Sequence, residues 1–414
     1  MSTETAIIDP SRRSWLDVPD DSDFPIQNLP FGIFSTPDHP GPRVGIAIGD
    51  QIIDLWAVQR AGLIDQRFRL VESLHDVLGP PADGRALRAR AADLMSVGNT
   101  ELDAVPDRGL VSQAEATMHL PFHVGDYVDF YSSEEHALNL GRLFRPDDPP
   151  LLPNWKHLPI GYHGRASTIV VSGSAITRPT GQRKPPESPP VFGPSVKLDI
   201  ELEVGFFTGP GNTIGRTIPV QRAEAHIAGL VLVNDWSARD LQAWEYRPLG
   251  PFLGKSFATT ISPWVVTLDA LAPYRVSAPT QDPQPLRYLR VEPNLGVDLN
   301  LEVELNDTIV SRTNFRHMYW TMAQQLAHVA SNGTSVRTGD LYASGTVSGP
   351  TRDSTGSFLE RTWNGIEPMA LADGSTRTFL EDGDTVVLRG WCGGDGRPRI
   401  GFGECRGVIV ASAQ

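Results

Sequence analysis

Residues 196–207 read VKLDIELEVGFF, and the regular alternation of acidic and apolar side chains is typical of a β-strand. Side chains on a strand alternate between its two faces. Asp199, Glu201 and Glu203 therefore fall on one face, and the aliphatic residues between them fall on the other. Neighbouring like charges repel each other wherever water is scarce. This acidic face therefore contacts either water or a cation.

Two further acidic residues favour the cation. Asp235 follows the apolar run AGLVLV, and Asp129 lies between Val128 and Phe130. A carboxylate in apolar surroundings is costly unless it is paired or bound to a metal. These candidates are all carboxylates, without a cysteine or a close histidine pair, so the site suits a hard ion such as Mg²⁺, Ca²⁺ or Mn²⁺ rather than zinc.

His136 lies seven residues after Asp129, in the segment YSSEEHALNLG. One short segment can thus supply both a metal ligand and a base, because a histidine titrates near neutral pH and can deprotonate water. A purely structural histidine is the alternative at this stage. The adjacent Glu134 and Glu135 are expected to be exposed neighbours of the base rather than partners that orient it.

The segment LGPFLGKSFATT resembles a phosphate-binding loop, but its spacing is wrong. Gly250 and Gly254 enclose three residues, whereas the nucleotide motif requires four. Lys255 is then free for another task. It can supply positive charge to an oxyanion or carbanion, with Arg239 and Gln242 as companion donors, although a surface lysine remains the alternative.

Composition favours a mostly β protein. The 414 residues include 35 prolines and 39 glycines, a usage that suits many turns between short strands. We predict a β-rich α+β class, with two or three domains from the length alone. The two cysteines, Cys392 and Cys405, are too few for a disulfide framework and are interpreted as core residues.

Charge and hydropathy exclude several classes of protein. A formal net charge of −13 repels polyanions, so nucleic acid is not expected as a partner. No apolar run reaches the length of a membrane span, and MSTETAIIDP lacks the features of a signal peptide. The sequence therefore predicts a cytoplasmic protein without a membrane partner.

The chain divides near residue 118 into an N-terminal unit, 1–118, and a region rich in aromatic and ionisable residues, 119–414. The first unit contains RVGIAIGDQIIDL, which reads as a hairpin around Gly49 and Asp50. A helical composition then extends over residues 73–97 and is interrupted by GPPADG. We expect this unit to support packing or dimer formation without taking part in the chemistry.

The second region is predicted to alternate short strands with Pro/Gly turns. One helix is expected from Phe315 to Ala330, with Asn314 as its N-cap and the NG dipeptide as its stop. Met318 and Met322 belong to the core in this interpretation. The clearest predicted strands are STIVVSG, LEVGFF, AGLVLVNDW, SPWVVTL, VDLNLEVELN and DTVVLRG.

Longer motifs resemble those of the fumarylacetoacetase family. They follow the family's order from about residue 120 to the C-terminus, and the N-terminal unit looks like the family's small SH3-like barrel. The motifs are DYVDFYSSEEHALNLGRLFR, PNWKHLPIGYHGRAS, LDIELEVGFF, NDWSARDLQAWEYRPLGPFLGKSFATTISPWVV, YWTMAQQLAHVASNG, YASGTVSGP and RIGFGECRG.

The resemblance implies an SH3-like barrel over residues 1–118, a catalytic β-roll over 119–414, and a homodimer. Asp199 has no ligand counterpart in the family, so the resemblance gives it a supporting or structural role. The implied ligands of a catalytic Mg²⁺ or Ca²⁺ are Asp129, Glu201, Glu203 and Asp235, with a second, structural cation near Asp235, Lys255 and Thr259.

The resemblance also implies a set of catalytic roles. His136 corresponds to the base and Glu360 to the acid that orients it, although the local sequence gave no reason to choose Glu360. The implied charge-stabilising groups are Arg239, Gln242 and Lys255. The implied substrate contacts are Tyr131, Arg145, Tyr162, Gln242, Tyr246 and Thr346.

The implied reaction is hydrolysis of the carbon–carbon bond of 4-fumarylacetoacetate to fumarate and acetoacetate, the last step of tyrosine and phenylalanine catabolism. The substrate is a small diketo dicarboxylic acid. One alternative is an acylpyruvate-type diketo-acid hydrolase with the same catalytic fold. Another, from a different class, is a non-catalytic binding protein that a metal ion stabilises.

Overall fold

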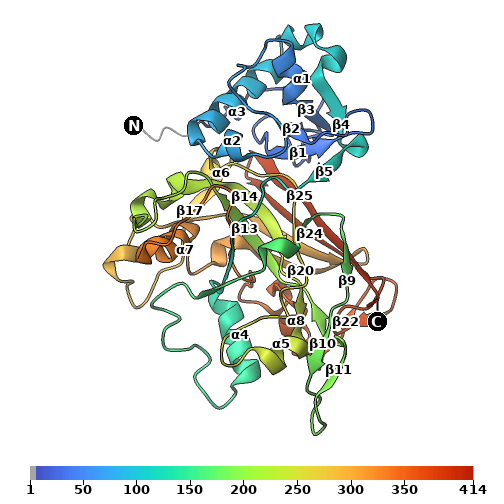
Figure 1. Ribbon diagram of the computed structural model, residues 1–414, viewed down its shortest axis with the longest axis vertical. Helices are drawn as coiled ribbons and strands as arrows, with labels where there is room; N and C mark the ends of the chain where they lie inside the picture. The colour runs from blue at the N-terminus through green and yellow to red at the C-terminus, as the bar shows by residue number, and fades with distance from the viewer. Residues whose placement is uncertain (1–5, 414) are drawn as a thin grey trace.

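Strands contribute more residues to the structure than helices do, and most of the strands are short (Figure 1). The computed structural model describes residues 6–413. Strands account for 30% of the chain and helices for 23%, which confirms the predicted β-rich α+β class. The expected lack of a signal peptide falls partly on residues 1–5, which lie outside the described residues. Between residues 6 and 413, no helix is both long and apolar enough to cross a membrane.

The N-terminal sheet lies at the upper end of the molecule in Figure 1. Its strand order is β4 (Leu110–Ser112), β3 (Gln51–Asp54), β2 (Arg43–Ile48), β1 (Phe31–Ser35) and β5 (Thr117–His119). The predicted hairpin is confirmed, because β2 pairs antiparallel with β3. Gly49 in the turn has a φ of 56°, a left-handed conformation that suits glycine.

Three helices accompany this sheet: α1 (Leu55–Arg60), α2 (His75–Leu78) and α3 (Pro81–Met95). The predicted helical interruption over residues 79–84 is too long. The break covers only Gly79 and Pro80, and Pro81 begins α3. A proline is tolerated at the first helical position because its missing N–H has no partner within the helix there.

The central sheet contains residues 202–207 of the acidic stretch VKLDIELEVGFF, as part of strand β13 (Leu202–Thr208). Strand β13 lies between β14 and β21, and it pairs antiparallel with both. The sheet order is β7 (Gly161–His163), β6 (Tyr127–Phe130), β21 (Leu341–Ala343), β13 (Leu202–Thr208), β14 (Ile227–Asn234), β16 (Thr259–Ile261) and β8 (Ile169–Val171).

Both faces of the central sheet are covered. Val204 and Phe206 of β13 belong to a core that includes residues of the third sheet. Phe207, Val231 and Val233 belong to a second core, which they share with the N-terminal sheet and its helices. The acidic end of β13 therefore lies deep between packed layers, and the alternative of a water-facing strand is wrong.

The prediction of one continuous strand over residues 196–207 is also wrong. Residues Leu198–Asp199 form β12, which pairs with β15 (Ser237–Ala238), and the chain joins the central sheet only at Leu202. Asp199 is thereby removed from the row formed by Glu201 and Glu203. The separation follows from tertiary pairing, which a periodic pattern does not encode.

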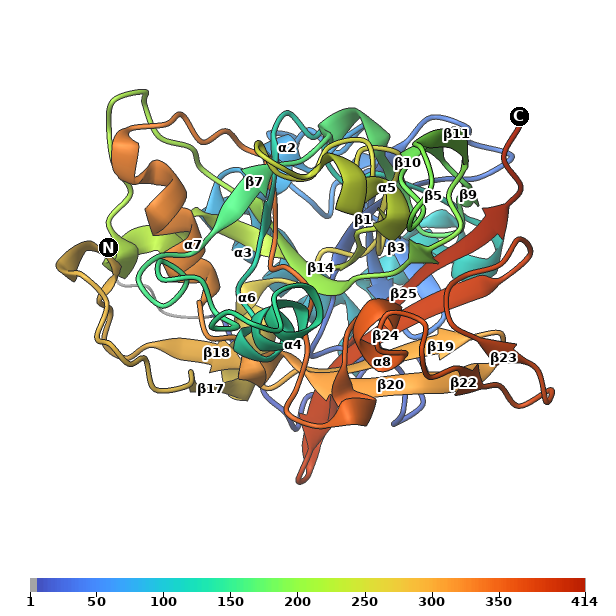
Figure 2. The same cartoon turned by 90° about the horizontal axis from the view of Figure 1, so that it is seen from below.

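The third sheet is built on two long strands that cross the molecule (Figure 2). Its order is β20 (Thr308–Asn314), β19 (Asn300–Leu305), β24 (Thr385–Gly394), β25 (Arg397–Val410) and β9 (Ala175–Thr177). Three small ribbons complete the strands: β10 (Thr180–Arg183) with β11 (Val191–Pro194), β17 (Arg275–Ser277) with β18 (Leu295–Val297), and β22 (Met369–Ala370) with β23 (Thr376–Arg377).

The predicted helix from Phe315 to Ala330 is broken. Residues Phe315–His317 form a short 3₁₀ turn capped by Asn314, and the α-helix α7 (Met322–Val329) begins only after a capping box at Thr321. The segment between them is extended because it packs against the residues before α4. Met318 and Met322 are buried, as predicted.

The predicted strand SPWVVTL is wrong as a regular strand. Val265 bridges to Phe31 of β1, and Val266 bridges to Leu230 of β14, so adjacent residues pair with different sheets. This segment connects the N-terminal sheet to the central sheet. The remaining helices are α4 (Glu134–Phe144), α5 (Arg239–Glu245), α6 (Leu268–Leu271) and α8 (Phe358–Arg361).

Candidate active site

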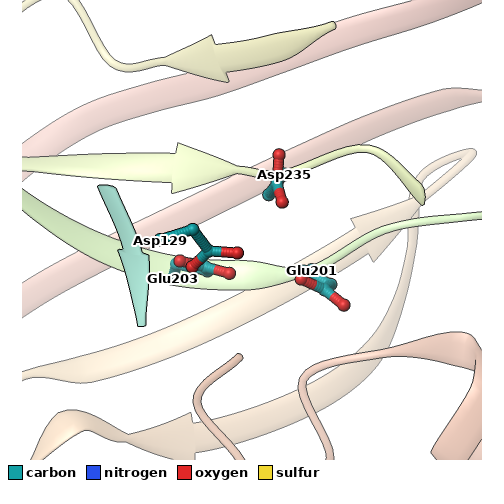
Figure 3. A group of neighbouring side chains, drawn as sticks. All are labelled: Asp129, Glu201, Glu203 and Asp235. Carbon is teal, nitrogen blue, oxygen red and sulfur yellow. The ribbon is translucent and has the colours of Figure 1, made fainter. Parts of the chain in front are cut away.

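Four buried carboxylates meet at one end of the central sheet (Figure 3). Asp129 comes from β6, Glu203 from β13, Glu201 from the residue before β13, and Asp235 from the residue after β14. One oxygen of each lies within 4.8 Å of the corresponding oxygen of every other. At most 6% of any of these residues is exposed, so water does not screen their charges.

Two oxygens of this carboxylate cluster lack a hydrogen-bond partner among the described residues. They are Oδ1 of Asp129 and Oε1 of Glu203. Glu203 does accept a bond from the backbone N–H of Gly345, at 2.9 Å, through its other oxygen. Burial raises the pKa of Asp129 and of Glu203 well above the ordinary value, and neighbouring negative charges add to the effect. Such orphaned oxygens fit a hard divalent cation.

Lys255 lies against the cluster from a loop. Its Nζ donates to Glu201 at 2.5 Å and to Asp235 at 2.7 Å. Burial opposes the charge of Lys255, but Asp235 and Glu201 outweigh it and hold the pKa of the ammonium group above its ordinary value. Thr259 donates to the other oxygen of Asp235 at 2.8 Å, and Tyr162 also donates to Asp235, at 3.2 Å.

Arg239, the first residue of α5, supplies a second buried cation. Its Nη1 donates to Glu201 at 2.7 Å and to Gln242 Oε1 at 3.3 Å, while its Nε donates to Asp199 at 2.8 Å. Burial raises the pKa of Glu201, but the charges of Lys255 and Arg239 reverse this and hold the pKa below its ordinary value. Glu201 therefore stays ionised between two cations.

His136 lies in the first turn of α4, where the Ser133 hydroxyl accepts a hydrogen bond from its backbone N–H. Its Nδ1 lies 2.7 Å from Oε2 of Glu360, which belongs to α8. When Nδ1–H donates a hydrogen bond to this carboxylate, Nε2 is the ring nitrogen that faces away from Glu360 and is available to accept a proton. This pair matches the spatial arrangement of a base and the acid that orients it.

Three further residues hold Glu360, and the sequence analysis missed all of them. Asn139 donates to Oε1 at 2.9 Å, while Ser348 and Ser357 donate to Oε2 at 3.0 and 2.7 Å. Burial raises the pKa of Glu360, but His136 and these donors hold it below its ordinary value. Only Asn139 had a sequence signal, since it lies one helical turn from His136.

A cavity of about 560 Å³ opens onto these groups. Glu203, Asp235, Thr259 and Glu360 do not line it and lie behind its wall. Arg145 follows α4, and its buried Nε has no hydrogen-bond partner among residues 6–413. The buried hydroxyl of Thr346 also has none within this range. The predicted site residues that line the cavity are Asp129, Tyr131, His136, Arg145, Tyr162, Glu201, Arg239, Gln242, Tyr246, Lys255 and Thr346.

The fold and this cavity define an enzyme site in which a carboxylate cluster, a histidine–carboxylate pair and buried cations lie around one cavity. Comparison with family models gives the same result. The model described as fumarylacetoacetase N-terminal matches residues 27–121, and the model described as fumarylacetoacetate hydrolase C-terminal matches residues 127–410. The chain belongs to the fumarylacetoacetate hydrolase family.

Relatives match over nearly the whole chain. Fumarylacetoacetase of Rattus norvegicus is 51% identical over 413 residues, which cover 96% of this chain and 98% of the rat protein. Two solved structures share the fold. A fumarylacetoacetate hydrolase from Exiguobacterium antarcticum is 17% identical and covers 92% of this chain and 99% of its own, with a TM-score of 0.52. Maleylpyruvate hydrolase from Sphingobium sp. SYK-6, solved with manganese(II) and pyruvate, is 14% identical and covers 93% and 100%, with a TM-score of 0.51.

Proposed function

We infer that this protein is an enzyme that hydrolyses 4-fumarylacetoacetate to fumarate and acetoacetate. The observation that carries this inference is identity of about half the residues to curated fumarylacetoacetases over 96% of the chain. The acylpyruvate-type alternative is not favoured, because the curated relatives that match nearly the whole chain at about half identity are fumarylacetoacetases. A non-catalytic binding protein would not need the His136–Glu360 pair and Lys255 at one cavity.

The metal site follows from the donor set. Asp129, Glu201, Glu203 and Asp235 would hold one divalent ion, for which the two orphaned oxygens are the strongest support. We propose Mg²⁺ or Ca²⁺, while Mn²⁺ is bound in the related maleylpyruvate hydrolase. When bound, the ion supplies Lewis-acid polarisation of a substrate carbonyl. The second, structural cation near Asp235, Lys255 and Thr259 also remains a proposal.

His136 acts as the general base in this account. Glu360 accepts a hydrogen bond from Nδ1–H and fixes the ring, so Nε2 removes a proton from a water molecule in the cavity. The resulting hydroxide attacks the ketone carbon of the fumaryl group, which is bonded to the CH=CH unit. In the tetrahedral intermediate, the bond from this carbon to the neighbouring methylene carbon then breaks. The oxygen that came from water stays with fumarate.

The leaving group carries the electron pair of the broken bond, which is unfavourable unless the charge is delocalised and neutralised. It leaves as the enolate of acetoacetate. Lys255 and Gln242 line the cavity and provide an ammonium group and an amide for this charge. The Nη2 of Arg239, buried and without a hydrogen-bond partner within the described chain, offers a third donor. The proton that His136 took from water passes to the carbanion, which completes acetoacetate and restores the base.

Substrate orientation depends on the two terminal carboxylates. We assign one of them to Arg145, whose planar guanidinium suits two-point recognition of a carboxylate. Its unpartnered Nε supports this assignment. Tyr131, Tyr162, Tyr246 and Thr346 complete the proposed contacts from the same cavity.

Several broader properties complete the proposal. We place the reaction at the end of tyrosine and phenylalanine catabolism, in the cytoplasm, and carried out by a homodimer. We also propose an SH3-like barrel domain over residues 1–118 and a catalytic domain over residues 119–414. The five-stranded N-terminal sheet and the separate family-model matches support this division.

The test follows the loss of the diketone ultraviolet absorbance after the purified protein is freed of metal with a chelator. Adding Mg²⁺ or Ca²⁺ should restore the loss and yield equal amounts of fumarate and acetoacetate. Cleavage of acylpyruvates with no action on fumarylacetoacetate would contradict the proposed substrate. Equal rates with and without an added ion would contradict the proposed metal site.

A further inference from the structure

Asp199 is a fully buried carboxylate that the mechanism above does not use. It lies at the end of β12, where the chain leaves one ribbon for the central sheet. Its Oδ1 accepts the backbone N–H groups of Ile200 and Phe358, each at 2.8 Å. Its Oδ2 accepts the N–H of Leu359 at 3.0 Å and Nε of Arg239 at 2.8 Å.

These donors leave no role for Asp199 as a ligand. Two hydrogen bonds reach each of its oxygens, and it lies outside the carboxylate cluster. It is also absent from the wall of the cavity, so it does not touch a substrate bound there. Any effect of Asp199 on the reaction must therefore pass through its partners.

The partners belong to two different parts of the site. Arg239 extends from Asp199 to Glu201 in the carboxylate cluster. Phe358 and Leu359 are the first two residues of α8, and the next residue is Glu360, which holds His136. One side chain thus connects the charge-stabilising part of the cavity to the part that carries the base.

The connection also sets the direction of Arg239. Because Nε is bound to Asp199 and Nη1 to Glu201, the planar guanidinium has a fixed orientation. Its third nitrogen, Nη2, is the one without a partner among residues 6–413. Losing the bond to Asp199 frees rotation about the end of this side chain.

We propose that Asp199 is a positioning residue that fixes Arg239 and the Glu360 segment relative to each other. It thereby keeps the histidine base and the groups that receive the leaving charge at one productive separation. A displacement of about 1 Å at a reacting centre costs on the order of a hundredfold in rate. The inference rests on the proposed function for its kinetic consequences, but its structural consequence can be measured separately.

The first experiment is the substitution Asp199→Asn, which keeps the shape but turns one acceptor into a donor that must face an N–H group. We expect kcat to fall about 10- to 100-fold, with KM within about threefold of the parent. The matched control is Asp384→Asn. Asp384 is a buried carboxylate that also accepts bonds from an arginine, Arg377, and from a backbone N–H, that of Glu381, away from the cavity. Its kcat should stay within about twofold.

A double-mutant cycle separates positioning from general support of the fold. If Asp199 acts through Glu360 and Arg239, its loss should matter little once either partner is changed. Adding Asp199→Asn to Glu360→Gln or to Arg239→Gln should therefore lower kcat by less than about threefold. Full additivity in both backgrounds would overturn the proposal. If Asp199→Asn does not fold, the cycle between Arg239→Gln and Glu360→Gln replaces it, and additive effects there would equally overturn the proposal.

The second readout is the proton resonance of the His136 Nδ1–H group in the metal-free protein. Asp199→Asn should shift or broaden this signal because Glu360 moves, whereas Asp384→Asn should leave it unchanged. An unchanged signal in Asp199→Asn would overturn the proposal. This measurement needs no substrate, so it distinguishes failure of the inference from failure of the proposed function.

Discussion

The Nε2 atom of His136 is the basic group on which water activation depends in this account. Replacing it by the substitution His136→Asn should lower kcat by about 10²–10⁴-fold, because general-base catalysis contributes a factor of this size. Binding of the divalent ion should persist, since His136 is not in the carboxylate cluster. Steady-state kinetics and calorimetric titration with Mg²⁺ check the two parts.

The control for this prediction is His328→Asn. His328 lies on α7 and hydrogen-bonds to Tyr288, outside the cavity. Its kcat should remain within about twofold of the parent. If His136→Asn kept more than a tenth of the parental kcat, another residue would have to serve as the base.

Glu203 makes stability depend on pH in the metal-free protein. Burial and the charge of Asp129 raise the pKa of this carboxyl in the folded state. The folded protein then binds more protons than the unfolded chain, so the free energy of unfolding falls as pH rises above about 4.3 towards the raised pKa. Metal-free Glu203→Gln should therefore have a higher Tm than the metal-free parent at pH 8, with a smaller difference at pH 4.

Saturating Mg²⁺ should reverse this order. A bound ion stabilises the folded protein, and it should stabilise the parent more than Glu203→Gln, which has lost one proposed ligand. The parent should then have the higher Tm at pH 8. Glu302→Gln, which removes a carboxylate paired with Arg312 away from the cluster, should show no reversal. A Tm order that is the same with and without Mg²⁺ would show that Glu203 is not a ligand.

At the scale of elements, Gly345 determines how closely β21 approaches β6. Its φ is +78°, and a Cβ atom there would lie 2.2 Å from the backbone oxygen of Phe130. Its N–H also donates to Glu203. Gly345→Ala should lower the free energy of unfolding by about 2–5 kcal/mol, from backbone strain and overpacking together, and should weaken Mg²⁺ binding.

Gly173→Ala is the matched control for this substitution. Gly173 has a φ of +93°, but nothing lies within 4 Å of an added Cβ. Urea denaturation should show a loss of only about 1–2 kcal/mol, from backbone strain alone. Equal losses in the two variants would mean that the close approach at Gly345 does not constrain the cluster.

Elements were predictable where one pattern dominated. The alternation in β13 placed Glu203 on the acidic face, and the continuous apolar run of β14 placed Asp235 at the point where a buried strand ends. The prediction of one helix from Phe315 is wrong because the backbone N–H groups of Tyr319 and Trp320 donate to Ser132, before α4, instead of continuing a helix. The strand predicted over SPWVVTL is wrong because Val265 and Val266 pair with residues of two different sheets.

At the scale of the whole molecule, the N-terminal sheet covers one face of the central sheet. Phe207, Val231 and Val233 of the central sheet share one hydrophobic core with Phe31 and Ile46 of the N-terminal sheet. A fragment of residues 119–414 would expose this apolar face. We expect it to aggregate when expressed alone, and a soluble fragment with parental kcat would show that the N-terminal unit is dispensable.

The site was only partly predictable because its residues come from distant parts of the chain. The carboxylates had local signals, since each lies in or beside an apolar strand. Glu360 contacts His136 from 224 residues away, and no local pattern marks it. Asn139, Ser348 and Ser357 are ordinary polar residues whose common contact with Glu360 exists only in the folded protein.

The central claim is that water attacks the ketone carbon of the fumaryl group within this cavity. A single-turnover reaction in ¹⁸O-labelled water, followed by mass spectrometry of both products, tests it most directly. The account predicts one labelled oxygen in the newly formed carboxylate of fumarate and none in the carboxylate of acetoacetate. Fumarate without the label, or label in the acetoacetate carboxylate, would contradict it.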